Sequence, residues 1–324
     1  MPLSSTDQYL TIARAGLFGL GALFSLSPIA TPALALAAGV ILALVFGNPW
    51  PAVTGTLGSR LLQVAVVALG LGISLDSLVR AGTTGVGLTV LVIAAVFAVG
   101  IQLGRWMAVD RDLSILVTAG TSICGGSAVA AIGPAIGASR EAMSVSLATV
   151  FVLNAVALYL FPAIGHLLDL SEHQFGVWAA LAIHDTSSVV GAAASYGPLA
   201  LEEATILKLA RALWILPLAL LIPRWNKRSS TVASSRMLAI PWFIGLFVLA
   251  AVARSMATPG TIAWFDTGAR AGRTALVLTL FLIGANLTRD QIRAVGMRPF
   301  LHGLLLWIIV GSATLAGVMF IVAR

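Results

Sequence analysis

The chain has 324 residues, of which 59% are hydrophobic and only 10% are charged. Soluble domains carry about 25% charged residues, so this composition excludes a water-soluble enzyme and predicts an all-α polytopic membrane protein. The formal net charge is +7. We nevertheless expect no nucleic-acid partner, because the basic residues lie mostly in short connections, where anionic lipid headgroups attract them. We expect residues 1–324 to form a single transmembrane transporter domain.

Apolar segments, separated by glycine, proline and charged residues, predict about 10 or 11 transmembrane helices of about 20 residues each. The apolar runs are continuous and lack the alternation that is typical of a transmembrane β-barrel. In chain order the predicted spans are Thr11–Leu26, Pro32–Phe46, Leu61–Leu75, Val86–Leu103, Leu113–Ile136, Ala142–Leu168, Phe175–Ser195, Ala204–Ile222, Leu238–Val252, Ala271–Leu287 and Phe300–Val322.

The densest basic cluster lies between two of these spans, in the segment Pro223–Arg236. The positive-inside rule places such a cluster in the cytoplasm. Counting spans outward from it puts most of the other loop arginines on the same side. This distribution predicts a cytoplasmic N-terminus and a C-terminus on the opposite side.

Two short segments resemble each other. Leu71–Leu75 ends one span and Ile283–Leu287 ends another, and an arginine-bearing loop and a further apolar span follow each. With the orientation above, the two copies cross the membrane in opposite directions, which is the pattern of inverted-repeat transporters with broken helices. The alternative is a chance likeness between two glycine-containing helices.

The segment Thr121–Ala128 places two adjacent glycines in the middle of an apolar span. Irregular backbone at this depth is tolerated where it faces protein or a water-filled cavity. A helix that restarts near Gly126 would present free N–H groups and a positive dipole end to an anion. The alternative is a small-residue face at which two helices pack closely. The predicted substrate-binding residues are Thr121, Ser122, Cys124, Gly125, Gly126 and Ser127, with Thr186 and Ser187 from a later span.

A second polar segment, beginning at His184-Asp185, lies near the middle of the predicted span Phe175–Ser195. A lone carboxylate at that depth costs about 3 kcal/mol, so Asp185 is expected to face a cavity, pair with a cation or be protonated. Histidine changes its charge near neutral pH. His184 and Asp185 are therefore predicted to couple transport to a proton or cation, with a structural polar cluster as the alternative.

Two cationic residues interrupt the next apolar stretch. Lys208 and Arg211 are three residues apart, so they share one helix face. They are predicted to balance charge, either by attracting an anion or by neutralising Asp185, and the alternative is that they snorkel toward the membrane interface. Asn154, in an earlier span, is expected to make a polar contact between helices.

Motifs of enzymes are absent from the sequence. It contains no Walker-type loop, no His-Glu-x-x-His, no Cys-x-x-Cys pair and no serine-nucleophile elbow. We therefore expect no enzymatic activity, no cofactor and no bound metal. Without a nucleotide site, transport would be passive or coupled to an ion gradient.

The motifs also carry a resemblance to a known family. The segments Ser122–Ala128, Ala182–Thr186 and Lys208–Arg211, with the turn at Gly47–Trp50 and the segment Gly70–Leu75, stand in the expected order. Over nearly the whole chain the sequence resembles the sulfate exporter family of YeiH-like bacterial inner-membrane proteins. The resemblance implies export of sulfate or a related sulfur oxyanion, and a fold related to bile-acid symporters and cation–proton antiporters. After His-Asp-Thr, the pair Ser187-Ser188 departs from the more amide-bearing continuation that the family pattern implies.

The predicted function is therefore a secondary transporter of a small anion, a sulfur oxyanion such as sulfate or sulfite, by proton- or cation-linked alternating access. Two alternatives stay open. One is a cation–proton or sodium-coupled antiporter with Asp185 as the cation site, and the other is a membrane sensor or scaffold that transports nothing. The expected partners are the anion, a coupling proton or sodium ion, the lipid bilayer and, as is common for this architecture, a second copy of the chain.

Overall fold

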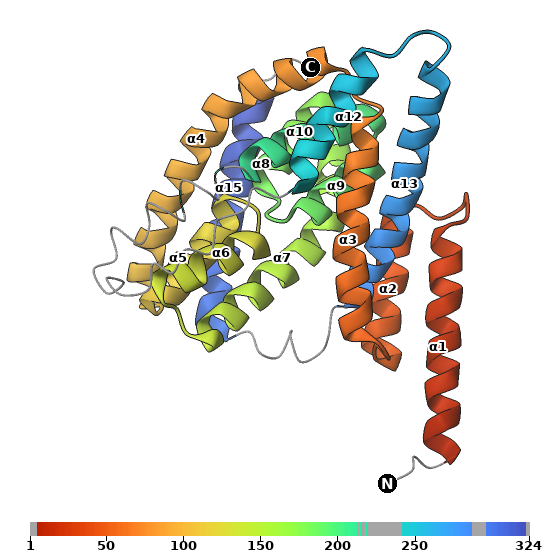
Figure 1. The fold of residues 1–324 in the computed structure, drawn as a ribbon. Helices are drawn as coiled ribbons and strands as arrows, with labels where there is room; N and C mark the ends of the chain where they lie inside the picture. The colour runs from red at the N-terminus through yellow and green to blue at the C-terminus, as the bar shows by residue number, and fades with distance from the viewer. Residues whose placement is uncertain (1–4, 213, 215–217, 219–241, 287–295, 322–324) are drawn as a thin grey trace. The chain divides into compact units, whose positions relative to one another are not determined.

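The computed structural model describes residues 5–212, 214, 218, 242–286 and 296–321. In these ranges the protein forms thirteen helices and no strand (Figure 1), which confirms the predicted all-α class. Five of the described helices contain a segment long and apolar enough to span a membrane, namely Pro51–Gly70, Thr89–Trp106, Arg140–Leu167, Ile262–Ala285 and Met297–Phe320. The protein is a polytopic membrane protein.

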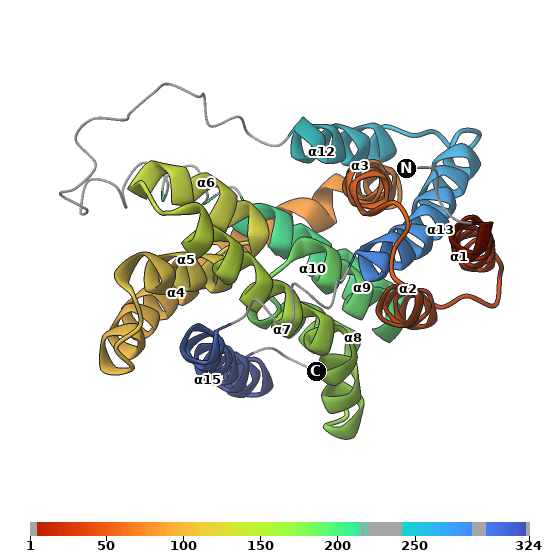
Figure 2. The same ribbon diagram turned by 90° about the horizontal axis from the view of Figure 1, so that it is seen from below.

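The chain divides into two compact units, and each unit takes segments from both halves of the sequence. The first comprises Met1–Leu75 and Phe243–Gln291. Within it, α13 packs along α2 and α3 (Figure 2). Glycine permits this close packing, since a Cβ at Gly272 would lie 2.8 Å from the Cβ of Ala68. The helices of this unit are α1 (Ser5–Ser25), α2 (Pro32–Phe46), α3 (Pro51–Gly70), α12 (Trp242–Ser255) and α13 (Ile262–Ala285).

A polar contact in the first unit fixes the turn between α2 and α3 to the end of α13. Asn48 Nδ2 donates hydrogen bonds to Thr54 Oγ1 (2.7 Å) and to the carbonyl oxygen of Ala285 (2.8 Å). Thr54 Oγ1 lies 3.0 Å from Asn286 Oδ1 and donates to it. These side chains bind one another, so the cluster has a structural role: it holds the turn against the end of α13.

The second unit comprises Asp76–Trp242 and Ile292–Arg324. In it, α10 packs on α8 and α9, while α15 contacts α5, α7 and α8. Trp178 of α8 stacks on Phe161 of α7, with ring centroids 4.4 Å apart, and donates its Nε1–H to the carbonyl oxygen of Gly311 in α15 at 2.9 Å. These contacts hold α8 against two long helices. The helices of this unit are α4 (Leu75–Trp106), α5 (Arg111–Ser122), α6 (Gly126–Ile136), α7 (Arg140–Leu167), α8 (Glu172–Ala182), α9 (Thr186–Tyr196), α10 (Pro198–Ala212) and α15 (Met297–Ile321).

Several helices, α3 and α13 among them, begin earlier than the hydropathy pattern predicts. α3 begins at Pro51 rather than at Leu61, because proline in the first helical turn has no N–H to leave unpaired and its φ angle already suits a helix. α13 begins at Ile262 rather than at Ala271, and its polar first turns include Asp266, which pairs with Arg254 at 3.0 Å. The hydropathy pattern misses these turns because they are polar.

Parts of the predicted organisation lie outside the described residues. The basic cluster Pro223–Arg236 falls there entirely. The predicted span Ala204–Ile222 is described only in part beyond Ala212, and Leu238–Val252 is described from Trp242 onward.

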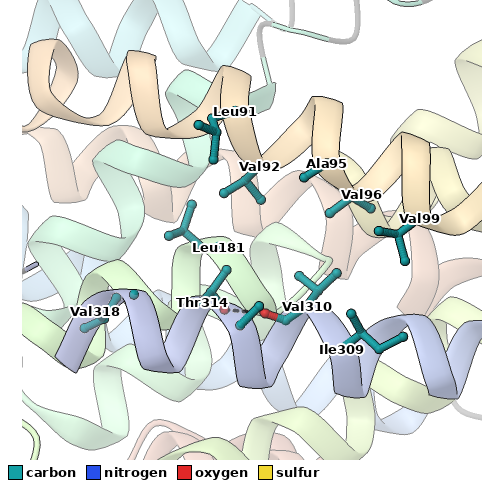
Figure 3. A pocket seen from close by; sticks show the side chains of 12 residues that line it. Leu91, Val92, Ala95, Val96, Val99, Leu181, Ile309, Val310, Thr314 and Val318 are labelled. Atoms are coloured by element: carbon teal, nitrogen blue, oxygen red, sulfur yellow. Dashed lines mark hydrogen bonds between the residues drawn. The ribbon is translucent and has the colours of Figure 1, made fainter. Parts of the chain in front are cut away.

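The helices around the two similar segments run in opposite directions within each unit. In the first unit α3 and α13 are antiparallel, since a Cβ at Gly58 would approach Leu282 and a Cβ at Gly268 would approach Leu71. In the second unit α4 and α15 are also antiparallel: the start of α15 contacts the later part of α4, and its end lies beside the earlier part (Figure 3). This arrangement agrees with the inverted repeat that the sequence predicts.

Candidate functional site

Two helical segments of the second unit are interrupted in their middle. The first interruption separates α5 from α6 at the glycine pair, where the sequence predicts it. Gly125 has φ +65° and ψ −125°, a conformation that residues with a Cβ rarely adopt. The break is therefore specified by glycine at this position.

The second interruption corrects a prediction. The hydropathy pattern predicts one span over Phe175–Ser195, but α8 and α9 are separate helices. Asp185 is the reason, because it is the N-cap of α9. Its Oδ2 accepts hydrogen bonds from the N–H groups of Ser187 (3.1 Å) and Ser188 (3.3 Å) and from the Ser187 hydroxyl. Aspartate is among the best N-cap residues, so Asp followed by Thr-Ser-Ser is the signal that hydropathy alone overlooks.

The two breaks lie against each other. A Cβ at Gly125 would lie 3.3 Å from both the Cα and the Cβ of Asp185. We call the paired breaks, residues 121–127 and 183–188, the junction. Glycine is needed at position 125 both for its φ angle and for this close approach.

Two cationic side chains of α10 bind the carboxyl ends of the helices that enter the junction. Arg211 donates from Nε to the carbonyl oxygen of Ser122 and from Nη1 to that of Leu181, each at 2.6 Å. Lys208 Nζ donates to the carbonyl oxygen of Ile183 at 2.6 Å. Arg211 is 1% exposed and Lys208 is 0% exposed, so neither snorkels to an interface. Their charges offset the negative dipole ends of α5 and α8.

The amino ends of the other two helices differ from each other. Asp185 caps α9, whereas α6 follows Gly125, which has no side chain to act as a cap. Within the described part of the chain, the N–H groups of Gly126 and Ser127 have no hydrogen-bond acceptor. Ser127 is exposed and Gly126 is half-buried. The amino end of α6 is thus an accessible group of N–H donors at a positive dipole end, which is suited to an anion.

Asn154 of α7 supports the second break. Its Oδ1 accepts hydrogen bonds from the N–H groups of His184 (3.2 Å) and Asp185 (3.4 Å). The sequence predicts a polar contact here but not that it binds the backbone of the break. The only indication of this contact in the sequence is that an amide side chain lies inside an apolar span.

Several buried polar atoms at the junction have no partner among the described residues: Asn154 Nδ2, both ring nitrogens of His184 and Thr121 Oγ1. Buried polar groups in proteins are nearly always hydrogen-bonded. Water or a polar ligand would satisfy such atoms.

The predicted substrate-binding residues fall on two sides of the junction. Gly125, Gly126, Ser127 and Thr186 lie at the amino ends of α6 and α9. Thr121, Ser122 and Cys124 are buried at the end of α5, where Arg211 binds the carbonyl oxygens of Thr121 and Ser122. The backbone carbonyl oxygens of Thr121 and Ser122 are therefore engaged by Arg211.

The remaining predicted residues also have clear positions. The Ser187 hydroxyl is engaged with Asp185, so it is not free to bind a ligand while that bond lasts. Among the described residues, Asp185 forms no ion pair with Lys208 or Arg211, whose nitrogen atoms bind carbonyl oxygens instead. The two cations offset the charges of helix ends, and Asp185 caps the amino end of α9.

Comparison with known proteins identifies the family. The family model described as Conserved hypothetical protein 698 matches residues 10–303. A UPF0324 membrane protein of Bdellovibrio bacteriovorus is 44% identical over 310 residues, covering 93% of this chain and 93% of the relative. Another of Bacteroides thetaiotaomicron is 45% identical over 292 residues (90% and 87%), and one of Shewanella oneidensis is 41% identical over 322 residues (99% and 99%). No solved structure matches. The resemblance to YeiH-like proteins is consistent with these matches, and the chain belongs to the UPF0324 membrane protein family.

Proposed function

We propose that the protein is a secondary transporter of a small anion, with the anion bound at the junction. A sulfur oxyanion such as sulfate or sulfite is the proposed substrate. The observation that carries the proposal is an imbalance among four helix ends. Buried cations neutralise the carboxyl ends of α5 and α8, and Asp185 caps α9, but the amino end of α6 is uncapped and accessible. The amino end of α6 therefore keeps a positive partial charge that no side chain offsets.

Asp185 would link anion binding to a proton. It lies close to Gly125, so an anion at the amino end of α6 would approach the Asp185 carboxylate. Two negative groups repel strongly where little water separates them. Protonation of Asp185 removes this repulsion, so the anion and the proton would bind together and move together. His184, whose ring nitrogens have no partner among the described residues, is the adjacent group that could pass the proton.

A cation–proton antiporter is the second candidate, because Asp185 is a carboxylate placed at the junction of two broken helices. The local charges weigh against it. One carboxylate lies near two buried cationic side chains, Lys208 and Arg211, which would disfavour the binding of a further cation.

The proposal also includes a location. A transporter of this kind would lie in the bacterial inner membrane, with its N-terminus in the cytoplasm as the positive-inside distribution favours. The coupling ion would be a proton, and a second copy of the chain is the proposed protein partner.

The test removes one backbone donor. Ser127 is the second residue of α6, and proline is tolerated in the first turn of a helix. Ser127→Pro removes the N–H, whereas Ser127→Ala removes only the hydroxyl. In calorimetric titrations of purified protein with sulfate and with sulfite, we expect wild type and Ser127→Ala to bind alike. We expect Ser127→Pro to bind roughly tenfold more weakly, because a hydrogen bond to a charged group contributes about 1.5 kcal/mol or more.

Two results would count against the proposal. Equal affinities of Ser127→Pro and Ser127→Ala, in proteins that unfold at the same temperature, would show that the amino end of α6 is not the binding site. Absence of binding of either anion to the wild-type protein would remove the proposed substrate class.

A further inference from the structure

An apolar groove runs between α4 and α15 in the second unit. Its cavity volume is about 280 Å³, many times the ~30 Å³ that one water molecule occupies in the liquid. Figure 3 shows side chains of both helices pointing into it, among them Val92 and Val96 of α4 and Val310 and Val318 of α15. Leu181 of α8 lies between the two helices and completes the lining.

The groove offers almost no polar contact. Among the described residues that line it, Thr314 alone carries a side-chain hydroxyl, and this hydroxyl donates to the carbonyl oxygen of Val310 at 2.6 Å, back onto its own helix (Figure 3). Water or a hydrated anion would lose hydrogen bonds on entering such a space. The chemistry of the lining therefore selects a hydrocarbon occupant.

The shape of the groove limits what that hydrocarbon can be. At one end α4 and α15 are in contact, because His302 Nε2 lies 2.9 Å from the carbonyl oxygen of Gly100 and a Cβ at Gly100 would lie 3.0 Å from Leu306. The open volume lies farther along, toward Leu91 and Val318. A helix with its side chains is about 10 Å across, which is too wide for this volume. A single flexible chain fits.

Both walls belong to segments that are long and apolar enough to span a membrane, Thr89–Trp106 and Met297–Phe320. Leu91, at the rim, is 66% exposed. The medium outside this rim is therefore the hydrocarbon of the bilayer. We propose that an acyl chain of a membrane phospholipid occupies the groove as a bound lipid and does not exchange freely with its neighbours.

The lining connects the groove to the junction. The side chain of Leu181 faces the groove, and its carbonyl oxygen accepts the hydrogen bond from Arg211 Nη1 at 2.6 Å. An acyl chain packed on Leu181 supports the end of α8 at the point where Arg211 holds it. Removal of the lipid should therefore lower the temperature at which the protein unfolds, whatever the protein transports.

The experiment uses the full chain in phospholipid nanodiscs that contain a phosphatidylcholine with a photoactivatable diazirine on one acyl chain. After irradiation, labelled peptides are located by mass spectrometry. We expect labelling to be concentrated in peptides that contain residues 91–99 and 309–318. The groove variant is Gly317→Phe, because a Cβ at Gly317 meets no atom within 4 Å and the ring can enter the groove. Gly245→Phe in α12 is the matched control, since its Cβ also meets nothing within 4 Å and it lies outside the groove.

Gly317→Phe is expected to reduce labelling of the groove peptides several-fold, while Gly245→Phe leaves it unchanged. If Gly317→Phe fails to fold, Ala313→Phe fills the same groove from the same helix. Native mass spectrometry should likewise show a lipid retained on detergent-purified wild type and lost from the groove variant. Labelling spread evenly over all membrane-facing helices would overturn the proposal. Labelling that neither groove variant reduces would do so as well.

Discussion

Arg211 donates its Nε–H to the carbonyl oxygen of Ser122 over 2.6 Å, and this bond ties α10 to the end of a helix 89 positions earlier in the chain. The same guanidinium binds carbonyl oxygens at the end of α8. A buried arginine usually needs an anionic partner. Here the partners are the negative ends of two helices, so the charge is offset without a carboxylate and Asp185 remains available at the opposite helix ends.

Arg211→Gln should destabilise the protein strongly. Each hydrogen bond to a charged group contributes about 1.5–3 kcal/mol, and the change removes several at once while leaving buried carbonyl oxygens unpaired. We expect the free energy of unfolding to fall by about 3 kcal/mol or more, measured by thermal unfolding in detergent. Arg254→Gln is the control, because its ion pair with Asp266 is partly exposed and such pairs contribute about 1 kcal/mol or less. Equal and small effects of the two changes would mean that Arg211 does not hold the junction together.

Gly125→Ala should abolish anion flux. The new Cβ would lie 3.3 Å from the backbone of Asp185, and the φ angle of +65° is unfavourable for alanine. Gly137→Ala, at the end of α6, also places alanine at positive φ (+68°), but its Cβ meets nothing within 4 Å. The control should therefore lose about 1 kcal/mol of stability and keep its flux. Flux assays on both variants in proteoliposomes decide the matter, and flux that survives in Gly125→Ala would show that the two breaks need not pack closely.

Asn154→Ala should reduce transport by freeing the backbone of the second break. The side chain now accepts hydrogen bonds from the N–H groups of His184 and Asp185. Asn154→Asp keeps an acceptor oxygen and should recover part of the flux. If aspartate and alanine reduce flux equally, in proteins with equal unfolding temperatures, then Asn154 does not act through these acceptor bonds.

Much of this arrangement can be predicted from the sequence. The rest cannot, and the reasons are physical. Two adjacent glycines inside an apolar run weaken a regular helix, so a break at Gly125 could be predicted from the local backbone alone. The break before α9 depends on an N-cap that hydropathy does not register, although Asp185 and the hydroxyl residues after it carry the signal. Both are local features of the chain.

The side chains that bind the two breaks could not be predicted from the sequence. No local pattern says that Arg211 binds Ser122 and Leu181, or that Asn154 accepts from the N–H of Asp185, because these contacts join distant parts of the chain. Two cations in an apolar stretch are unusual, and the sequence predicts Asp185 as one partner of Lys208 and Arg211. The sequence cannot predict that backbone carbonyl oxygens are the partners, because every residue has one.

The most direct measurement is the flux of labelled sulfate and sulfite into proteoliposomes, with and without a pH gradient, for wild type and Asp185→Asn. Asparagine is as good an N-cap as aspartate, so this variant should fold while it loses the charge. We expect wild-type uptake to rise when the outside is more acidic, and Asp185→Asn to lose that response while still binding the anion. Absence of flux of either anion through folded wild-type protein would contradict anion transport at the junction, and flux indifferent to pH would contradict the role given to Asp185.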